Sequence, residues 1–380
     1  MAHDFEAEGL LDGVDDPGAR RARLELLERL AADGVGVDEL KRAVADHRLA
    51  LLPVERMLAS EGRRYSAHEI AARSGVGIEY LDSLWRSLGL PLVDRDERAY
   101  SDEDLEAARV VKSFLDAGFP PEGVLEVSRV LGNGMATLVA AVNDLARRIL
   151  VQPGDSELDV AIRLAEAAGE LAPGLDPLLT YVANHHRREQ NRQAVVGATE
   201  LGAAATHTVV CFADLVGFTQ LGEELPPDEL GGLARRLAEM AETVVKPPVT
   251  LVKTIGDAVM LVAPDADPMV DAALGLLERA EAEGEGFPGL RAGIAAGEAL
   301  RRAGDWYGSP VNRASRVTAR ARRGSVLVTA EVREATRGDY DWSDAGRKRL
   351  RGVSDEVSVF RVRRQGQAAD TPGRRRGSDP

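Results

Sequence analysis

Apolar residues recur at helical spacing through the first half of the chain, for example at Leu24, Leu27, Leu30 and Ala31. Residues three and four apart lie on one face of a helix, so residues 20–177 are predicted to form an all-helical domain. Glycine and proline joints are expected to divide it into short helices, at residues 16–18, 34–36, 118–121, 132–134 and 153–154. Residues 1–19 are expected to be a disordered N-terminus.

The second half alternates short apolar runs with amphipathic stretches. Strands are expected near residues 208–213, 249–254, 258–262, 290–296, 325–329 and 357–362. Helices are expected at residues 228–245, 269–283 and 312–321, with a short one from Glu331. Strands paired as hairpins and backed by helices on one side indicate a ferredoxin-like α+β sandwich over residues 206–364.

Two further segments complete the predicted organisation. Residues 178–205 are polar and compatible with a helix, and they are interpreted as a linker helix between the two halves. Residues 365–380 contain Pro372, Gly373 and a run of arginines, which is typical of a disordered tail.

Charge and composition narrow the functional classes. The formal net charge of −14 disfavours binding to nucleic acid or to an anionic membrane. The most apolar stretch, residues 135–151, is interrupted by Asn143, Asp144, Arg147 and Arg148, so no transmembrane helix is expected. The N-terminus lacks a basic and an apolar signal region, and the single cysteine, Cys211, lies in an apolar run. These features predict a cytoplasmic protein.

Residues 65–90 have the pattern of a helix, a glycine turn and a second helix, as in a helix-turn-helix. Such a motif can bind DNA or can serve only as a compact hairpin for packing. Packing is favoured, because the second helix carries Glu79 and Asp82 against Arg86, whereas a groove-reading helix needs an excess of positive charge.

Two acidic residues stand where strand-like runs end. Asp214 follows the run at 208–213, and Asp257 follows Ile255 and Gly256. Either residue alone would be read as part of a turn. Together they are typical of a two-metal phosphoryl-transfer site, because Mg²⁺ takes one or two protein carboxylates and completes its shell with water and phosphate oxygens.

A third polar segment makes the pattern specific, since residues 305–316 place Asp305, Asn312 and Arg316 at the opening of a helix. With the two acidic segments, this stretch resembles the catalytic domain of class III nucleotidyl cyclases, from about residue 206 to residue 362. Within that class it is similar to the soluble actinobacterial adenylate cyclases. The helical half resembles their regulatory domain, which is associated with autoinhibition and pH sensing.

The resemblance implies that ATP is converted to cyclic AMP and pyrophosphate with two divalent cations per site, Mg²⁺ or Mn²⁺, held by Asp214 and Asp257. Backbone groups at the start of a helix would cradle the triphosphate, those of Leu215, Gly217, Phe218 and Thr219. Lys253 and Asp305 fall on the base-reading pair. A donor beside a carboxylate acceptor fits the edge of adenine, whereas guanylate cyclases have an acidic and a smaller residue there.

The same resemblance assigns Asn312 to the ribose and Arg316 to the charge on the α-phosphate. They are four residues apart and therefore share one helix face, whereas Arg313 is expected to be a surface charge. Arg351 stands where the family usually has a lysine that contacts the outer phosphates. Arginine keeps the charge but binds through a planar fork.

In this family the acidic residues come from one subunit, and the base-reading pair, the asparagine and the arginine come from the other. This chain carries both sets, so a homodimer with two interfacial active sites is expected. A proton or a small molecule is the expected effector of the helical domain. His185, His186 and His68 are candidate proton sensors, because the ordinary histidine pKa is about 6.5. Alternatively, the adjacent histidines are simply solvated.

Three other functions were weighed: a nucleotide-sensing DNA-binding regulator, a catalytically inactive cyclase homologue and a guanylate cyclase. The inactive homologue is disfavoured because no metal-binding or catalytic position is missing. Lys253 and Asp305 disfavour the guanylate cyclase.

Overall fold

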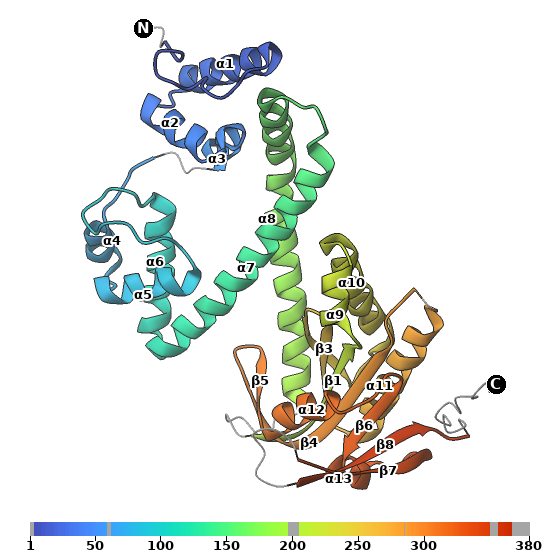
Figure 1. Cartoon of the computed structure of the whole chain (residues 1–380). Helices are drawn as coiled ribbons and strands as arrows, with labels where there is room; N and C mark the ends of the chain where they lie inside the picture. The colour runs from blue at the N-terminus through green and yellow to red at the C-terminus, as the bar shows by residue number, and fades with distance from the viewer. Residues whose placement is uncertain (1–3, 59–61, 197–204, 285, 350–355, 367–380) are drawn as a thin grey trace, which may run out of the picture. The chain divides into compact units, whose positions relative to one another are not determined.

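The computed structural model describes residues 4–58, 62–196, 205–284, 286–349 and 356–366 (Figure 1). The chain divides into two compact units, Met1–Ala198 and Thr199–Pro380. Each unit has hydrophobic cores of its own, so each is described by itself.

The described part of the first unit is helical, as its apolar periodicity predicts. Its elements are α1 (Pro17–Ala32), α2 (Val37–Ala45), a short 3-10 turn (Leu49–Leu51), α3 (Leu52–Leu58), α4 (Ala67–Ser74), α5 (Ile78–Leu88), α6 (Asp102–Asp116), α7 (Pro121–Leu150) and α8 (Glu157–Val196).

The N-terminus differs from its predicted disorder from residue 4 onward. Phe5, Leu10 and Leu11 are buried, and they pack with the apolar face of α1. The acidic residues and glycines around them hid this apolar set in the sequence, although it supplies part of the core around α1.

Two predicted breaks are absent. Gly132 lies inside α7, where a Cβ atom would come within 2.4 Å of the Leu88 carbonyl oxygen. This glycine therefore permits close packing of α7 on α5 and does not end a helix. The expected boundary at residue 177 also falls within a helix, since α8 continues through Pro173 and Pro177 to Val196.

The helix-turn-helix pattern corresponds to α4 and α5, which are joined at Gly75 with a φ of 75°. Helix α5 buries Leu81, Leu84 and Trp85 in a core. The ring of Trp85 stacks on the ring of Tyr100, with 4.2 Å between the ring centroids. The acidic side chain at position 82 pairs with Arg95. These contacts fit the packing role predicted for the motif.

Among the described residues, α7 is the one helix long and apolar enough to cross a membrane by length and composition. Its best 18-residue window has a mean hydropathy of 1.2, and 17% of that window is buried. No span was predicted because polar and charged residues interrupt the apolar run, but the window that qualifies holds at most two charged residues. Length and composition alone do not establish a span.

The second unit is built on a mixed sheet whose strand order is β2-β3-β1-β4-β6-β8-β7, with β5 paired to β4. The strands are β1 (Thr206–Leu215), β2 (Thr250–Ile255), β3 (Ala258–Ala263), β4 (Leu290–Arg302), β5 (Asp305–Gly308), β6 (Ser325–Thr329), β7 (Tyr340–Arg349) and β8 (Glu356–Arg364). The helices are α9 (Phe218–Glu224), α10 (Pro227–Val244), α11 (Ala266–Ala282), α12 (Ser309–Thr318) and α13 (Ala330–Ala335).

The sheet has a different cover on each face (Figure 1). Alternate residues of β1, including Val209 and Cys211, pack with α10, α11 and α13 in the main core. The intervening residues, including Val210, pack with Ala314 of α12 on the opposite face. The α+β class is therefore as predicted, but helices lie on both faces. The α12 face carries the candidate site.

Candidate active site

The two acidic residues are brought together by strand pairing. Asp214 lies near the end of β1, opposite Ala258 of β3, and Asp257 occupies the turn that precedes β3. The amide of Leu215 donates to the Asp257 carbonyl oxygen at 3.0 Å. This bond fixes the two acidic turns side by side, and both side chains are only partly exposed.

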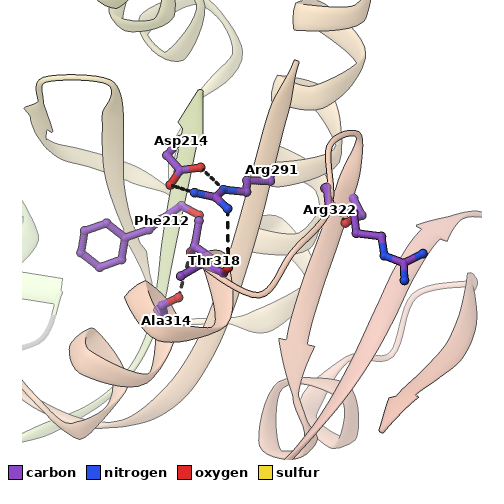
Figure 2. A network of polar contacts seen from close by, with 8 residues as sticks. Phe212, Asp214, Arg291, Ala314, Thr318 and Arg322 are labelled. Carbon is purple, nitrogen blue, oxygen red and sulfur yellow. Dashed lines mark hydrogen bonds and ion pairs between the residues drawn. The ribbon is translucent and has the colours of Figure 1, made fainter. Parts of the chain in front are cut away.

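Arg291 of β4 is the nearest cation, and the sequence analysis missed it. It faces Asp214 directly in the β1–β4 register, on the α12 face of the sheet. Its Nε donates to Asp214 Oδ1 at 2.6 Å and its Nη2 to Oδ2 at 3.0 Å (Figure 2). This two-point geometry holds the carboxylate in one orientation.

The acidic pair is electrostatically coupled. Burial raises the pKa of Asp214, and the nearby Asp257 carboxylate adds to this rise, while Arg291 opposes it. The bonds to Asp214 raise the pKa of Arg291, which stays charged. A second positive charge at this position would therefore relieve repulsion between the carboxylates.

The donor set fits a hard cation. No group of three or more His, Cys, Asp or Glu side chains that could hold a metal occurs within the described residues. The coupled carboxylates of Asp214 and Asp257 offer oxygen alone, which suits Mg²⁺ or Mn²⁺ and leaves positions for water and phosphate oxygens. The desolvated carboxylate of Asp214 already requires a cationic partner.

Lys253 and Asp305 meet within one chain, although 52 positions separate them. The Lys253 ammonium pairs with Asp305 Oδ2, and the amide of Trp306 donates to Oδ1 at 2.9 Å. Partial burial would raise the pKa of Asp305, but the lysine and this amide outweigh burial and lower it. A β-bulge in β2 at Val252 places Lys253 opposite Met260, and therefore on the α12 face.

Helix α12 presents the other predicted pair. Asn312 and Arg316 are exposed on it, while Ala314 and Val317 are buried against the sheet. Residues four positions apart lie on the same face of a helix, so Asn312 and Arg316 share the face that points away from the sheet. Arg313 pairs with Glu331 at 3.1 Å, so it is a partly buried ion-pair member and not a free surface charge.

The loop expected to cradle phosphate is well defined. Gly217 has a φ of 78° and precedes α9, which begins at Phe218. The side chain of Phe218 packs against the main core, and Thr219 is exposed. Because the Leu215 amide N–H already donates to the Asp257 carbonyl oxygen, it is not available to a ligand in this structure.

The remaining predicted residues lie elsewhere. Arg351 lies outside the described residues. In the first unit, His185 and His186 are exposed on α8, with ring centroids 6.3 Å apart. His68 is exposed on α4, with its Nε2 3.8 Å from Asp96.

Comparison with known proteins agrees with this architecture. Residues 3–191 match the adenylate cyclase regulatory domain, and residues 203–363 match the adenylate and guanylate cyclase catalytic domain. The chain is 42% identical over 358 residues to a pH-sensitive adenylate cyclase of Mycobacterium tuberculosis, covering 91% of this chain and 89% of that protein.

Two Streptomyces proteins are also similar. The chain is 32% identical over 280 residues to an adenylate cyclase of Streptomyces griseus, covering 72% of this chain and 69% of the relative. It is 32% identical over 288 residues to an adenylate cyclase of Streptomyces coelicolor, covering 74% of each. Sheet, site and both domain matches agree, and the chain belongs to the class III adenylate cyclases that carry an adenylate cyclase regulatory domain before the catalytic domain.

Proposed function

We propose that the protein converts ATP to 3′,5′-cyclic AMP and pyrophosphate at two equivalent sites of a homodimer. One observation carries this proposal: the acidic turns, the Lys253–Asp305 pair and helix α12 all belong to the same face of the sheet. Groups for the metal, the base and the phosphates are thus available on one surface.

Asp214 and Asp257 would hold two divalent cations, Mg²⁺ or Mn²⁺. When bound, such ions lower the pKa of the attacking ribose hydroxyl and neutralise charge on the leaving pyrophosphate. Asp214 is kept oriented by Arg291 until then. Once that carboxylate has another partner, the guanidinium of Arg291 can donate to phosphate oxygens, which match its planar fork.

Lys253 and Asp305 would select the base. Lysine donates to a ring nitrogen of adenine, and the carboxylate accepts from the exocyclic amino group. Each residue satisfies the other before substrate binds, as their ion pair indicates. A base with a different arrangement of hydrogen-bond donors and acceptors would leave a polar group without a hydrogen-bond partner, at a cost of about 1–3 kcal/mol.

A second copy of the chain would complete each site. Asn312 and Arg316 are exposed on α12, consistent with contact to a ligand held by a partner. Apolar side chains beside the site are exposed as well, Ile255 at 47% and Tyr307 at 55%. A partner that covers this face would bury them. Asn312 would orient the ribose, and Arg316 would stabilise charge on the α-phosphate.

The helical unit would inhibit the catalytic unit in a pH-dependent manner, in the cytoplasm. The similarity to a relative that is named pH-sensitive supports this part of the proposal. A proton acting on the histidines of α8 is the favoured effector, and a small molecule bound among the helices is the other.

The proposal is tested by incubating the purified full chain with ATP or GTP and with Mg²⁺ or Mn²⁺, and identifying the product. Cyclic AMP formed from ATP is the expected result. Asp257→Ala should abolish turnover while the thermal unfolding transition is retained. Cyclic GTP as the main product, or full activity in the Asp257→Ala variant, would refute the assignment.

A further inference from the structure

The C-terminal turn of α12 is locked onto the sheet by a buried hydroxyl. Thr318 is 2% exposed, and its single hydroxyl proton is shared between the Phe212 carbonyl oxygen, 3.1 Å from Oγ1, and the Ala314 carbonyl oxygen, 2.8 Å from Oγ1 (Figure 2). The Ala314 bond lies within the helix, whereas the Phe212 bond joins the helix to β1. Only the second bond positions α12 relative to the sheet.

The fit at this joint is close. Gly293 of β4 lies beneath it, and a Cβ atom there would come within 2.2 Å of the Thr318 nitrogen. Gly293 faces Phe212 in the β1–β4 register, so strand, strand and helix meet at one point. Because no side chain separates them, a small shift of the helix would break the Thr318 bond.

Both ends of this joint lead to predicted site residues. Phe212 precedes Asp214 by two positions on β1 and therefore lies on the same face of the strand. Thr318 closes the helix that carries Asn312 and Arg316. The Thr318 hydroxyl thus sets the register between the acidic end of the strand and the helix.

A second link lies beside the first and is of a different kind. Arg291 holds Asp214, and its Nη1 donates to the Ala319 carbonyl oxygen at 3.5 Å, at the end of α12 (Figure 2). This link is long, part-exposed and dependent on a carboxylate that is also the proposed metal ligand. The Thr318–Phe212 bond involves no charge and is partly buried, so it persists when Arg291 changes partner.

We infer that Thr318 is a positioning residue which couples the two active sites of the dimer, an inference that rests on the proposed function. In that dimer, Asp214 and Asp257 of one chain serve one site, and Asn312 and Arg316 of the same chain serve the other. The Thr318–Phe212 hydrogen bond is therefore a direct link, within one chain, between half-sites that act on different nucleotides.

The test uses mixed dimers with a single working site. One chain carries Asp257→Ala and the other Asn312→Ala, so the working site takes its carboxylates from the second chain and its asparagine from the first. Activity of this mixture supports the shared site. If it is inactive while the unsubstituted protein is active, the interfacial proposal fails and the inference fails with it.

Thr318→Val is then placed in one chain or in the other of an active mixture. Valine keeps the shape and removes the hydroxyl. We expect kcat to fall about tenfold or more in both arrangements, with a much smaller change in KM for ATP, because small misplacements of catalytic groups cost this much. Thr318→Ser should restore most of the rate, since it keeps the donor.

Two results would overturn the inference. A loss confined to the chain that supplies Asn312 would mean that Thr318 only supports its own helix. No loss in either arrangement would mean that it positions nothing. Thr336→Val is the matched control, because Thr336 follows the last residue of α13 and its hydroxyl donates back to the Val332 carbonyl oxygen of that helix at 2.6 Å. If Thr318→Val does not fold, Thr318→Ala, which adds no bulk, is assayed in the same two arrangements with the same expected losses.

Discussion

At the scale of single residues, the base-selecting role that we propose for Lys253 and Asp305 depends on the charge of Asp305. The pKa of Asp305 lies below its ordinary value in the folded chain, despite partial burial. A depressed carboxylate pKa means that the charge, and the stability it contributes, are lost only as pH falls through that low value. The Asp305 carboxylate should therefore stay ionised across the physiological range.

Asp305→Ala should lower kcat/KM for ATP by about tenfold, the equivalent of about 1.4 kcal/mol, with no gain for GTP. In the unsubstituted protein the ratio of ATP to GTP turnover should be constant between about pH 5 and about pH 8, because an aspartate with a lowered pKa does not titrate there. Initial rates with both nucleotides measure this ratio.

Asp271→Ala provides the control, since it breaks an ion pair with Arg364 on the opposite face of the sheet. It should leave the nucleotide ratio unchanged. A ratio that falls steeply below neutral pH in the unsubstituted protein would contradict the role assigned to Asp305.

The sequence identified the acidic residues because both stand where apolar runs stop, a local feature. Arg291 was missed because an arginine between Leu290 and Ala292 looks like an ordinary outward-facing strand residue. Its partnership with Asp214 depends on the register of two strands that are 77 positions apart. The interruption of a buried strand by a cation was the one available signal.

At the scale of elements, periodicity predicted most helices and strands of the catalytic unit within a few residues. Strand β7 was missed because its charged residues give no apolar alternation, and it pairs only with β8. Gly132 was wrongly predicted to end a helix, whereas it lets α7 pack closely on α5. A close tertiary contact of this kind has no local sequence signature. The local sequence pattern therefore predicts helices and strands more reliably than it predicts whether a glycine ends a helix or permits close packing.

Helix α8 concentrates charge near its end. His185 and His186 are followed directly by Arg187 and Arg188, and His185 and Arg188 are three positions apart, so a protonated His185 would lie beside the Arg188 cation on one helix face. Like charges three or four positions apart on a helix repel each other and destabilise it. Acidification should therefore alter this segment.

Replacing both His185 and His186 with Asn should flatten the dependence of cyclase activity on pH, measured as initial rates across the range in which histidine titrates. His47→Asn is the control, because His47 has a φ of 54°, a conformation that asparagine tolerates well. His68→Asn tests the remaining candidate. An unchanged profile in the double variant would remove these histidines from the mechanism.

At the scale of the whole molecule, composition and periodicity predicted a helical part followed by an α+β part. The two compact units meet at residues 198 and 199, within the predicted linker of residues 178–205, whereas the expected start of that linker falls inside α8. The dimeric site that we propose could not be deduced from one chain's pattern. The expectation of a dimer came from the resemblance to a family in which each site takes groups from two subunits. This chain holds both sets of groups.

Residues 199–380 expressed alone should fold, because the main core of this unit draws on no residue of the first unit. They should form cyclic AMP at least as fast as the full chain and with a weaker pH dependence, because the helices that we propose to be inhibitory are removed. Rates are compared at protein concentrations at which both forms are dimeric. A fragment that melts cooperatively but turns over ATP more slowly would indicate that the helical unit activates the enzyme.

The position of Cys211 has a further consequence. It is the only cysteine of the sequence, it is wholly buried in β1, and burial raises the pKa of its thiol to about 12. The native protein therefore offers no reactive sulfur at its surface. A cysteine introduced at a chosen exposed position would be the sole target for a spin label or a thiol cross-linker, so distances between copies can be measured without first removing a natural residue.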